Sequence, residues 1–477
     1  MHRVTSAVVL LTVLVVGFTT GCADQEMPPN IVLILIDDLG WTDLGVMGSD
    51  YYETPNIDRL AEQGVMFSQA YANAPNCAPS RASLLSGQYA PRHGIYTVGS
   101  SARGSASDRR LIPTENKTAL SLEIVTIAEV LQAAGYATGH FGKWHLGGAG
   151  YLPTDQGFDV NVAGNELGTP PSYFYPYEGA RGQLSELAQT GTPNEYLTDR
   201  LTDEALRFME SNAERPFFLY LSHYAVHTPI RAKDEVIDRF RDKEVKGEHD
   251  NPTYAAMIYS VDESVGSVVS VLEELDIQDN TVVFFFSDNG GFEPVTSMAP
   301  LRGSKGMLYE GGIREPLIVR WPGTIEAGTT TDFQTIGTDL YPTILDIAGV
   351  APPSGQVLDG VSLVPVLRGT GVLTERSLFW HFPAYLEADR SVTGPWRTTP
   401  VGAVRRGRYK LLQFFEDNRL ELYDLEADVG ERRNLAGSQP DTTNQLLRLL
   451  EEWRAATDAP VPTEPNPEFN RSTNHNR

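Results

Sequence analysis

The sequence predicts an α/β protein with a large mixed, mostly parallel sheet sandwiched by helices, followed by a smaller antiparallel sheet plus one helix. Three observations support this prediction. Apolar runs rich in β-branched and aromatic residues alternate with helical patterns through most of the chain. From about Glu375 the runs become shorter, turns join them, and one amphipathic helix follows. A length of 477 residues also exceeds what one ordinary core accommodates, which indicates two domains.

Four runs are typical of strands buried on both faces, because they are apolar without alternation. They lie at 30–37, 216–223, 281–288 and 316–321. Helical patterns lie at 56–64 with Asn56 as N-cap, at 124–135 closing at Gly135, and at about 253–275. Strands that alternate with helices in this way favour a mostly parallel sheet covered on both faces.

The last quarter of the chain predicts a different architecture. Short runs at 378–382, 401–407, 409–415 and 420–425 predict an antiparallel sheet, and residues 442–456 predict a helix that packs on it. We therefore expect a main domain over 28–374 and a small C-terminal subdomain over 375–457. The tail, 458–477, is rich in Pro and Asn and is predicted to be disordered.

Residues 1–22 are typical of an export signal. A basic start precedes an apolar run at 7–18 that is too short to span a bilayer stably. The run ends in TTGC, which is similar to a bacterial lipobox and predicts a lipid anchor on Cys22. Ordinary cleavage near Ala23 is the alternative. We expect an exported protein, in the periplasm or as an outer-membrane or cell-surface lipoprotein of a Gram-negative bacterium.

The net charge and the cysteine content limit the functions that the chain can have. A formal net charge of −24 argues against nucleic acid as a partner, because nucleic-acid binding needs a basic surface. The chain has 2 cysteines, and if Cys22 is lipidated or removed, Cys77 has no partner for an intramolecular disulfide. Cys77 is then a buried inert thiol, a thiolate nucleophile or a modified residue.

Oxygen-bearing side chains follow two of the predicted strands. Asp37 and Asp38 end the first run, and Asp288 and Asn289 end the third. Because ligands in an open α/β sheet bind beyond the carboxyl ends of its strands, these side chains are expected to meet at one edge. Carboxylate and amide oxygens suit a hard cation. The alternative is that each pair caps a helix or turn.

Basic side chains lie in loops predicted to leave the same edge of the sheet. Lys143 and His145 belong to a glycine-rich loop that we expect to run over the surface, and His227 follows the run at 216–223. The remaining candidates are Arg302, Lys305 and Arg314, which lie among glycines. As alternatives, the histidines are satisfied structural residues and the lysines are solvated charges.

The run CAPSRASLLSG, from Cys77 to Gly87, resembles the signature of the type I, formylglycine-dependent sulfatases. The resemblance extends from Asn30 to about Leu435 through NIVLILIDDLGW, TPNIDRLAEQGV, GYATGHFGKWHLG, HTP, DNGG and RGSKGMLYEGGIREP. Two departures, Asn76 before the cysteine and Phe141 before Gly142, remove no chemical group. Within the alkaline phosphatase superfamily, the chain is similar to the arylsulfatases and N-acetylgalactosamine-6-sulfatases.

The resemblance implies an alkaline-phosphatase-like main domain and a sulfuric ester hydrolase that acts on a sulfated carbohydrate outside the cell. It implies that a formylglycine-generating enzyme converts Cys77 to Cα-formylglycine (3-oxoalanine). It also implies one calcium ion per chain. The implied metal ligands are Asp37, Asp38, the modified Cys77, Asp288 and Asn289.

The resemblance also assigns roles to the basic residues. Arg81 and Lys143 would steady the hydrated formylglycine, His145 would act as the base that triggers sulfate elimination, His227 would protonate the leaving alcohol, and Lys305 would grip sulfate oxygens. A phosphate or phosphonate ester hydrolase of the same superfamily and a non-catalytic glycan-binding protein are the competing functions. His381, Tyr385 and Trp396 are candidates for sugar contact, with core packing as the alternative.

Overall fold

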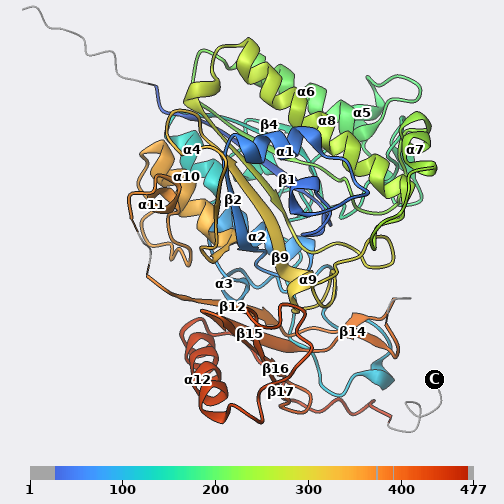
Figure 1. Cartoon of the computed structure of the whole chain (residues 1–477), viewed down its shortest axis with the longest axis vertical. Coiled ribbons are helices and arrows are strands. Elements are labelled where there is room, and N and C mark those ends of the chain that lie inside the picture. The colour runs from blue at the N-terminus through green and yellow to red at the C-terminus, as the bar shows by residue number, and fades with distance from the viewer. Residues whose placement is uncertain (1–26, 372–373, 390–391, 471–477) are drawn as a thin grey trace, which may run out of the picture.

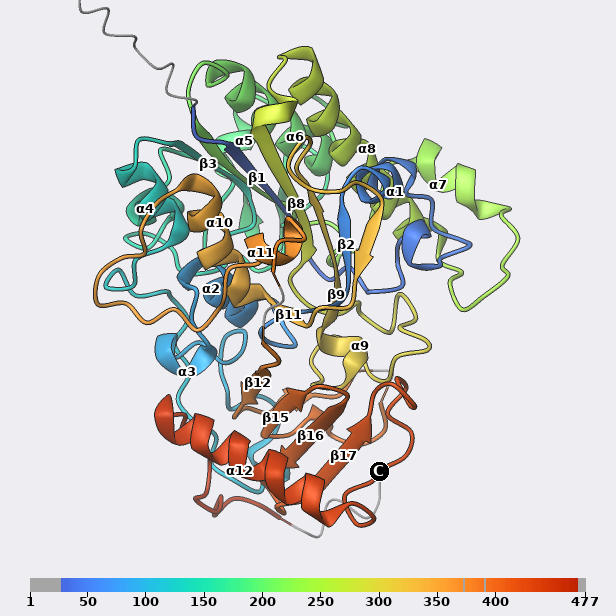
Figure 2. The same cartoon turned by 60° about the vertical axis from the view of Figure 1, so that its left-hand side comes forward.

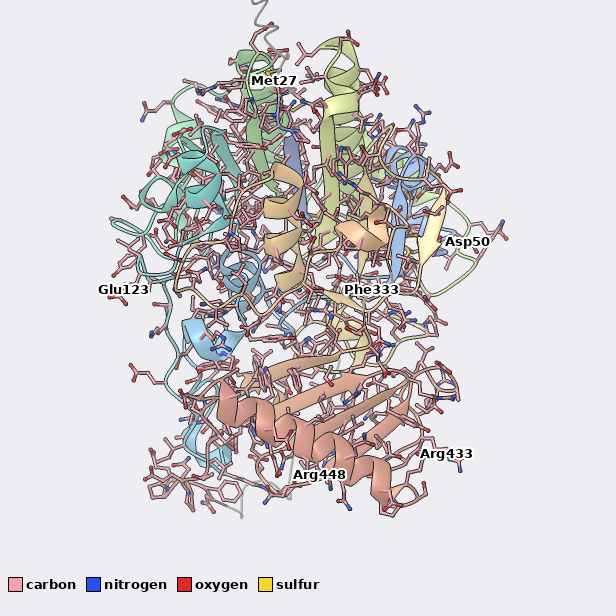
Figure 3. The ribbon with its side chains drawn as sticks, turned by 90° about the vertical axis from the view of Figure 1, so that its left-hand side faces the viewer. Met27, Asp50, Glu123, Phe333, Arg433 and Arg448 are labelled. Carbon is pink, nitrogen blue, oxygen red and sulfur yellow. The ribbon has the colours of Figure 1, made fainter. Side chains whose placement is uncertain are left out.

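The computed structural model describes residues 27–371, 374–389 and 392–470, so the predicted signal segment and Cys22 lie outside the described residues. A large sheet with helices on both faces lies next to a smaller antiparallel sheet with one helix (Figure 1). Met27, the first described residue, lies at one end of the molecule, and Arg448 lies at the other (Figure 3). The predicted fold class is confirmed.

The large sheet has the strand order β10-β2-β9-β8-β1-β7-β3-β4, with β11 beside β2. Among its described strands only β9 runs antiparallel to its neighbours, which makes the sheet mixed but mostly parallel. The strands are β1 (Asn30–Ile36), β2 (Val65–Tyr71), β3 (Ala137–Gly142), β4 (Val160–Val162), β7 (Phe217–Ser222), β8 (Thr281–Ser287), β9 (Arg314–Arg320), β10 (Thr329–Thr331) and β11 (Thr335–Ile336). The four runs predicted from sequence are β1, β7, β8 and β9; β2 and β3 were not recognised.

Helices cover both faces because the central strands are apolar on both sides. Val32, Ile34 and Ile36 of β1 belong to one core, with α1 (Pro55–Glu62), α6 (Leu197–Ser211), α7 (Asp234–Arg241) and α8 (Pro252–Glu274). Ile31, Leu33 and Leu35 belong to the other, with α2 (Cys77–Ser86), α4 (Ile127–Ala133), α10 (Leu340–Ala348) and α11 (Val364–Leu367). Shorter elements complete the main domain: α3 (Ala90–His93), α5 (Ser185–Ala188), α9 (Glu310–Ile313), the hairpin β5 (Glu178–Gly179) and β6 (Gly182–Gln183), and the 3-10 helices η1 (Gly45–Met47), η2 (Ala106–Asp108), η3 (Pro153–Gln156), η4 (Gln278–Asn280) and η5 (Gly337–Asp339).

The predicted start of α1 is corrected by the structure. The helix begins at Pro55, so Asn56 is its second residue rather than its N-cap. Asp262 of α8 replaces a local cap, since its carboxylate accepts hydrogen bonds from the peptide nitrogens of Asn56 and Ile57 at 2.9 and 2.8 Å. By length and composition α8 could cross a membrane, but its apolar side chains pack in the core between the sheet and α1, α6 and α7.

The C-terminal part of the chain has the predicted antiparallel sheet and helix. Strands β12 (Ser377–Phe382), β15 (Val401–Arg406), β16 (Tyr409–Phe414) and β17 (Leu420–Asp424) form an antiparallel sheet in that order. Helix α12 (Pro440–Ala456) lies across one face through Leu446 and Leu450 (Figure 2). The other face packs on the main domain, where Trp380 and Phe382 share a core with Tyr71. A separate hairpin, β13 (Leu386–Glu387) and β14 (Trp396–Thr398), leaves this subdomain.

The described part of the tail differs from the disordered segment expected from its composition. Residues 458–470 extend along the segment that contains η2. The peptide nitrogen of Ile112 donates to the carbonyl of Glu464 at 2.9 Å, and Asn466 Nδ2 donates to the carbonyls of Ala106 and Arg109 at 2.7 and 2.9 Å. The order comes from partners about 350 residues away in the chain, which local composition does not reveal.

A buried ion cluster joins the two parts of the molecule. Lys410 Nζ of β16 lies 3.0 Å from Glu310 Oε1 and 3.0 Å from Glu431 Oε1, and all three side chains are fully buried. Burial raises the pKa of Glu431 to about 7; the charge of Lys410 opposes the rise and that of Glu310 adds to it. Because Glu310 begins α9, this cluster fixes the C-terminal sheet to the loop that carries Lys305.

Candidate active site

The strand ends bring four oxygen-bearing side chains together, as their positions in the sequence predict. Strands β1 and β8 pair in parallel up to their last residues, so Asp37-Asp38 and Asp288-Asn289 emerge side by side. Asn289 Nδ2 donates to Asp38 Oδ1 at 2.8 Å, and the peptide nitrogen of Asp38 donates to Asp288 Oδ1 at 3.3 Å. All four side chains are buried, which makes the cluster a local concentration of negative charge at the carboxyl edge of the sheet.

Cys77 lies at this same edge. It is the first residue of α2, follows the extended residue Asn76, and is 2 % exposed. One ligand atom from each of Asp37, Cys77 and Asp288 lies within 4.8 Å of the others. Burial raises the pKa of the Cys77 thiol, and nearby lysines do not offset it. The unmodified side chain is therefore a protonated thiol held against two carboxyl groups.

Two buried cations face the acidic cluster. Lys143 Nζ lies 2.6 Å from Asp37 Oδ2, and Arg81 Nε lies 2.7 Å from Asp288 Oδ2. Arg81 Nη1 also donates to the carbonyl of Lys143 at 2.9 Å and to Ser222 Oγ. Burial, with the charge of Asp37, raises the pKa of Asp288 to about 6 although Arg81 opposes the rise. The glycine-rich segment around Lys143, expected as a surface loop, is corrected by the structure. Residues 137–142 form strand β3 between β7 and β4, and Lys143, which follows this strand, is fully buried.

Asp38 carries a second pair of basic groups. Lys305 Nζ lies 2.6 Å from Asp38 Oδ1, and His227 Nε2 lies 3.6 Å from Asp38 Oδ2. Burial alone would raise the pKa of Asp38, but Lys305 and His227 lower it well below its usual range. His227 Nδ1 lies 2.8 Å from the carbonyl of Thr228 and must donate to it, which directs Nε2 toward the cluster. Burial and the charge of Lys305 lower the pKa of His227 to about 3.

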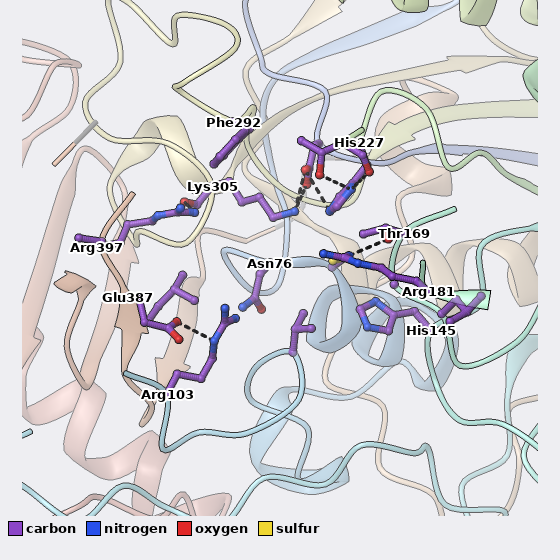
Figure 4. Close-up of a pocket in the computed structure, with 18 residues that line it drawn as sticks. Asn76, Arg103, His145, Thr169, Arg181, His227, Phe292, Lys305, Glu387 and Arg397 are labelled. Carbon is purple, nitrogen blue, oxygen red and sulfur yellow. Dashed lines mark hydrogen bonds and ion pairs between the residues drawn. The ribbon is translucent and has the colours of Figure 1, made fainter. Parts of the chain in front are cut away.

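His145 lies across the cavity from His227 (Figure 4). Its backbone has φ 61°, and its peptide nitrogen donates to the carbonyl of Asn165 at 2.9 Å. A Cβ on Gly168 would lie 2.4 Å from the imidazole, so glycine at that position leaves room for the ring. Burial and the charge of Lys143 lower the pKa of His145, and Nδ1 has no hydrogen-bond partner among the described residues. A neutral imidazole with an unused nitrogen is suited to accept a proton.

The acidic cluster fits a hard cation. Asp37 Oδ1 and Asn289 Oδ1 are buried and make no hydrogen bond in the described parts of the chain. Unpaired buried oxygens are costly unless another group satisfies them. Carboxylate and amide oxygens are the ligands that calcium and magnesium take in proteins, so the donor set of Asp37, Asp38, Asp288 and Asn289 matches such an ion.

A cavity of about 610 Å³ opens over these groups (Figure 4). Its lining includes Asp38, Cys77, His145, His227 and Lys305, so the predicted catalytic residues that are not fully buried line one cavity. Hairpin β13–β14 and its flanks form part of the wall. Sequence reasoning missed the other polar residues of the wall, since they come from loops and short hairpins without a repeating pattern: Asn76, Arg103, Thr169, Arg181, Thr228, Glu387 and Arg397.

The predicted sugar-contact residues pack elsewhere. His381 is buried, and its Nε2 donates to the carbonyl of Pro460 at 2.8 Å. The hydroxyl of Tyr385 donates to Glu416 Oε1 at 2.7 Å, and its ring lies 4.7 Å from that of Trp396. None of the three lines the cavity, which favours core packing for all of them.

Two of the basic candidates, Arg302 and Arg314, make contacts with other protein groups outside the cavity. Arg302 lies over the ring of Tyr309 at 3.9 Å and donates to the hydroxyl of Tyr423 at 2.9 Å. Arg314 donates to the carbonyl of Ser68 and lies over the ring of Trp41. Neither lines the cavity, so Lys305 is the basic residue of this segment that reaches the site.

Comparisons with known proteins identify relatives of this chain. A family model described as Sulfatase matches residues 29–350, and one described as N-sulphoglucosamine sulphohydrolase, C-terminal, matches residues 304–456. The chain is 35% identical over 511 residues to a protein named sulfatase from Formosa agariphila, covering 92% of this chain and 91% of that protein. It is 34% identical over 457 residues to N-acetylgalactosamine-6-sulfatase of Canis lupus familiaris, covering 90% and 80% of the two chains. Among solved structures, Ps i-CgsB in complex with k-i-k-neocarrahexaose superposes with a TM-score of 0.75 at 30% identity, covering 94% of this chain and 96% of that one.

Proposed function

Because this chain belongs to the sulfatase family, we propose that it removes sulfate from a sulfated carbohydrate by means of a formylglycine made from Cys77 and one bound calcium ion. The chain is an enzyme of the sulfuric ester hydrolase class. The observation that carries the mechanistic proposal is the meeting of Cys77 with Asp37 and Asp288 within 4.8 Å. Strand ends and a helix start that are distant in sequence converge there.

The calcium ion would be held by Asp37, Asp38, Asp288 and Asn289 together with an oxygen of the modified residue 77. When bound, it polarises the sulfate group and stabilises negative charge on an attacking oxygen. The buried oxygens Asp37 Oδ1 and Asn289 Oδ1, which have no hydrogen-bond partner among the described residues, support this assignment.

The modified residue 77 would supply the nucleophile. Hydration of its aldehyde gives a carbon with two hydroxyl groups, one to attack sulfur and one whose loss of a proton releases the sulfate. Arg81 and Lys143 would steady this side chain, since both are fully buried and each is paired with a carboxylate, Asp288 or Asp37, that lies close to Cys77. Their positive charges also favour the ionised form of a neighbouring hydroxyl.

The histidines and Lys305 would act on the substrate side. His145 lines the cavity, its buried Nδ1 makes no hydrogen bond among the described residues, and its imidazole takes the proton from residue 77. His227 directs Nε2 toward Asp38 and gives a proton to the leaving alcohol oxygen; the negative charge of a bound sulfate ester promotes its protonation. Lys305 reaches the cavity beside Asp38 and binds sulfate oxygens.

A carbohydrate is the substrate class that the relatives favour. N-acetylgalactosamine-6-sulfatase acts, by its name, on a sulfated sugar, and Ps i-CgsB was solved with a neocarrahexaose. A cavity of about 610 Å³ that is open to solvent can admit one or two sugar rings of a longer chain. The predicted export of the chain is consistent with an external polysaccharide or its oligosaccharides.

Two measurements test the mechanism. Mass spectrometry of the proteolytic peptide that contains residue 77 should show the mass of the aldehyde or its hydrate when the protein is made together with a formylglycine-generating enzyme. Turnover of an aryl sulfate should require this modification and should disappear in Cys77→Ala. An unmodified thiol in an active preparation contradicts the nucleophile assignment.

Selectivity between esters tests the reaction class. The same preparation should hydrolyse an aryl sulfate substantially faster than the matching aryl phosphate or phosphonate. Faster cleavage of the phosphorus ester would favour the competing hydrolase, and modified protein without turnover of either ester would favour a glycan-binding protein. Dialysis against a chelator should abolish turnover, and added calcium should restore it.

A further inference from the structure

Three arginines line the cavity, and two of them are neutralised by acidic neighbours. Arg103 Nε lies 2.7 Å from Glu387 Oε2, and Arg397 forms an ion pair with Asp389. Arg181 differs from both. Its Nη1 donates to the neutral hydroxyl of Thr169 at 2.8 Å, and it makes no ion pair with a carboxylate in the described part of the chain.

Arg181 is also placed to reach a bound substrate. It lies at the turn of the β5–β6 hairpin, and its side chain extends into the cavity between His145 and His227 (Figure 4). These two histidines mark where the ester bond would be cleaved under the proposed function. A guanidinium has five N–H donors in a planar fork, and the hydrogen bond to Thr169 uses only one of them.

The charges around the cavity determine which ligand groups the free N–H donors of Arg181 would bind. Lys305 is paired with Asp38, and the other two arginines are paired within the wall, so Arg181 contributes a positive charge without a protein counterion. In a protein with a formal net charge of −24, an uncompensated cation beside the reaction centre attracts anions locally. Arginine binds carboxylate and sulfate oxygens through two parallel hydrogen bonds.

We propose that Arg181 binds a second anionic group of the substrate, a sulfate or a carboxylate on the same sugar or its neighbour. The substrate class is then a polyanionic carbohydrate, in which the ester to be cleaved lies close to another negative charge. This inference rests on the proposed function, because the position of the cleaved ester is taken from it. Arg181 is a specificity residue and takes no part in bond breaking.

The test compares a singly charged with a doubly charged ligand. The variants are Arg181→Gln, Arg181→Lys and the control Arg207→Gln, which removes an exposed arginine paired with Glu204 on α6, outside the cavity. Each is assayed for hydrolysis of an aryl sulfate and for inhibition of that reaction by a monosulfated and a disulfated disaccharide of the same backbone. The wild type should bind the disulfated disaccharide more tightly, and added salt should reduce the difference.

Because Arg181→Gln removes one charge-assisted contact, it should weaken binding of the disulfated disaccharide about tenfold to a hundredfold more than binding of the monosulfated disaccharide or of the aryl sulfate. Arg181→Lys should recover part of this difference, and Arg207→Gln should match the wild type. An equal effect of Arg181→Gln on all three ligands, or inhibition by neither disaccharide, would overturn the inference. Failure of the wild type to hydrolyse the aryl sulfate would instead contradict the proposed function.

Discussion

Replacing Lys410 with methionine should destabilise the protein strongly and in a pH-dependent manner. Lys410 is fully buried and lies 3.0 Å from both Glu310 and Glu431. Methionine fills a similar volume but leaves the buried Glu431 without its lysine partner and leaves Glu310 with only Arg314, whose Nη1 lies 3.5 Å from Glu310 Oε2. Removing one partner of a buried ion pair costs about 3–5 kcal/mol of unfolding free energy, so we expect a loss of this size at pH 8.

The pH dependence follows from the direction of the pKa shift. In the folded wild type the pKa of Glu431 is about 7, above its ordinary value of 4.5, and loss of Lys410 removes the main charge that opposes this rise. The folded state therefore binds more protons than the unfolded state between these values, and stability falls as pH rises through the window. The deficit of Lys410→Met should be largest at pH 8 and should shrink at pH 5.5, where the buried carboxyl of Glu431 is protonated.

Urea unfolding followed by tryptophan fluorescence measures this loss, because Trp380 is buried at the junction between the C-terminal sheet and the main domain. A triple variant with Glu310→Gln and Glu431→Gln added is the matched control and should recover most of the stability, since it removes the two carboxyl charges that Lys410 neutralises, while Arg314 keeps its hydrogen bonds to the carbonyl of Ser68. A loss below about 1 kcal/mol at pH 8, or a deficit that grows as pH falls, would refute the reasoning.

Three further changes test other parts of the structure. Asp288→Asn should lower aryl sulfate turnover by at least about a hundredfold, because it weakens the metal site and leaves Arg81 unpaired; turnover near that of the wild type would argue against this metal site. Asp262→Ala should lower the urea midpoint by the equivalent of about 1–3 kcal/mol, because the peptide nitrogens of Asn56 and Ile57 lose their acceptor. Asn466→Ala should increase proteolysis of the 458–470 segment without changing turnover, since its amide fixes that segment through two carbonyl contacts; unchanged proteolysis would show that the contacts contribute nothing measurable.

The acidic half of the site was predictable because it follows from two strong strand patterns. The runs that end at Asp37 and Asp288 are almost wholly apolar, and parallel neighbours bring such ends to one edge. The proximity of Cys77 to these residues could be expected only from the family resemblance. It depends on β2, which delivers α2 to the same edge and which the sequence patterns did not reveal.

The burial of Lys143 was not predictable from its surroundings in the sequence. Strand β3 reads ATGHFG, and its two glycines and central histidine give neither a β-branched run nor an alternation. It is a strand because β7 and β4 supply hydrogen-bond partners on both sides. Arg103, Arg181 and Arg397 were not predicted for a related reason, since one irregular segment and two short hairpins bring them to one cavity.

The groups proposed to react and the residues that line the outer cavity lie on separate segments of the chain. The former are fixed to strand ends and to α2, whereas Arg181, Glu387 and Arg397 belong to two small hairpins, β5–β6 and β13–β14. Hairpins can lengthen, shorten or change residues while a sheet edge stays in place. Related enzymes can therefore change the sulfated glycan that they bind while they keep the residues that cleave its sulfate ester.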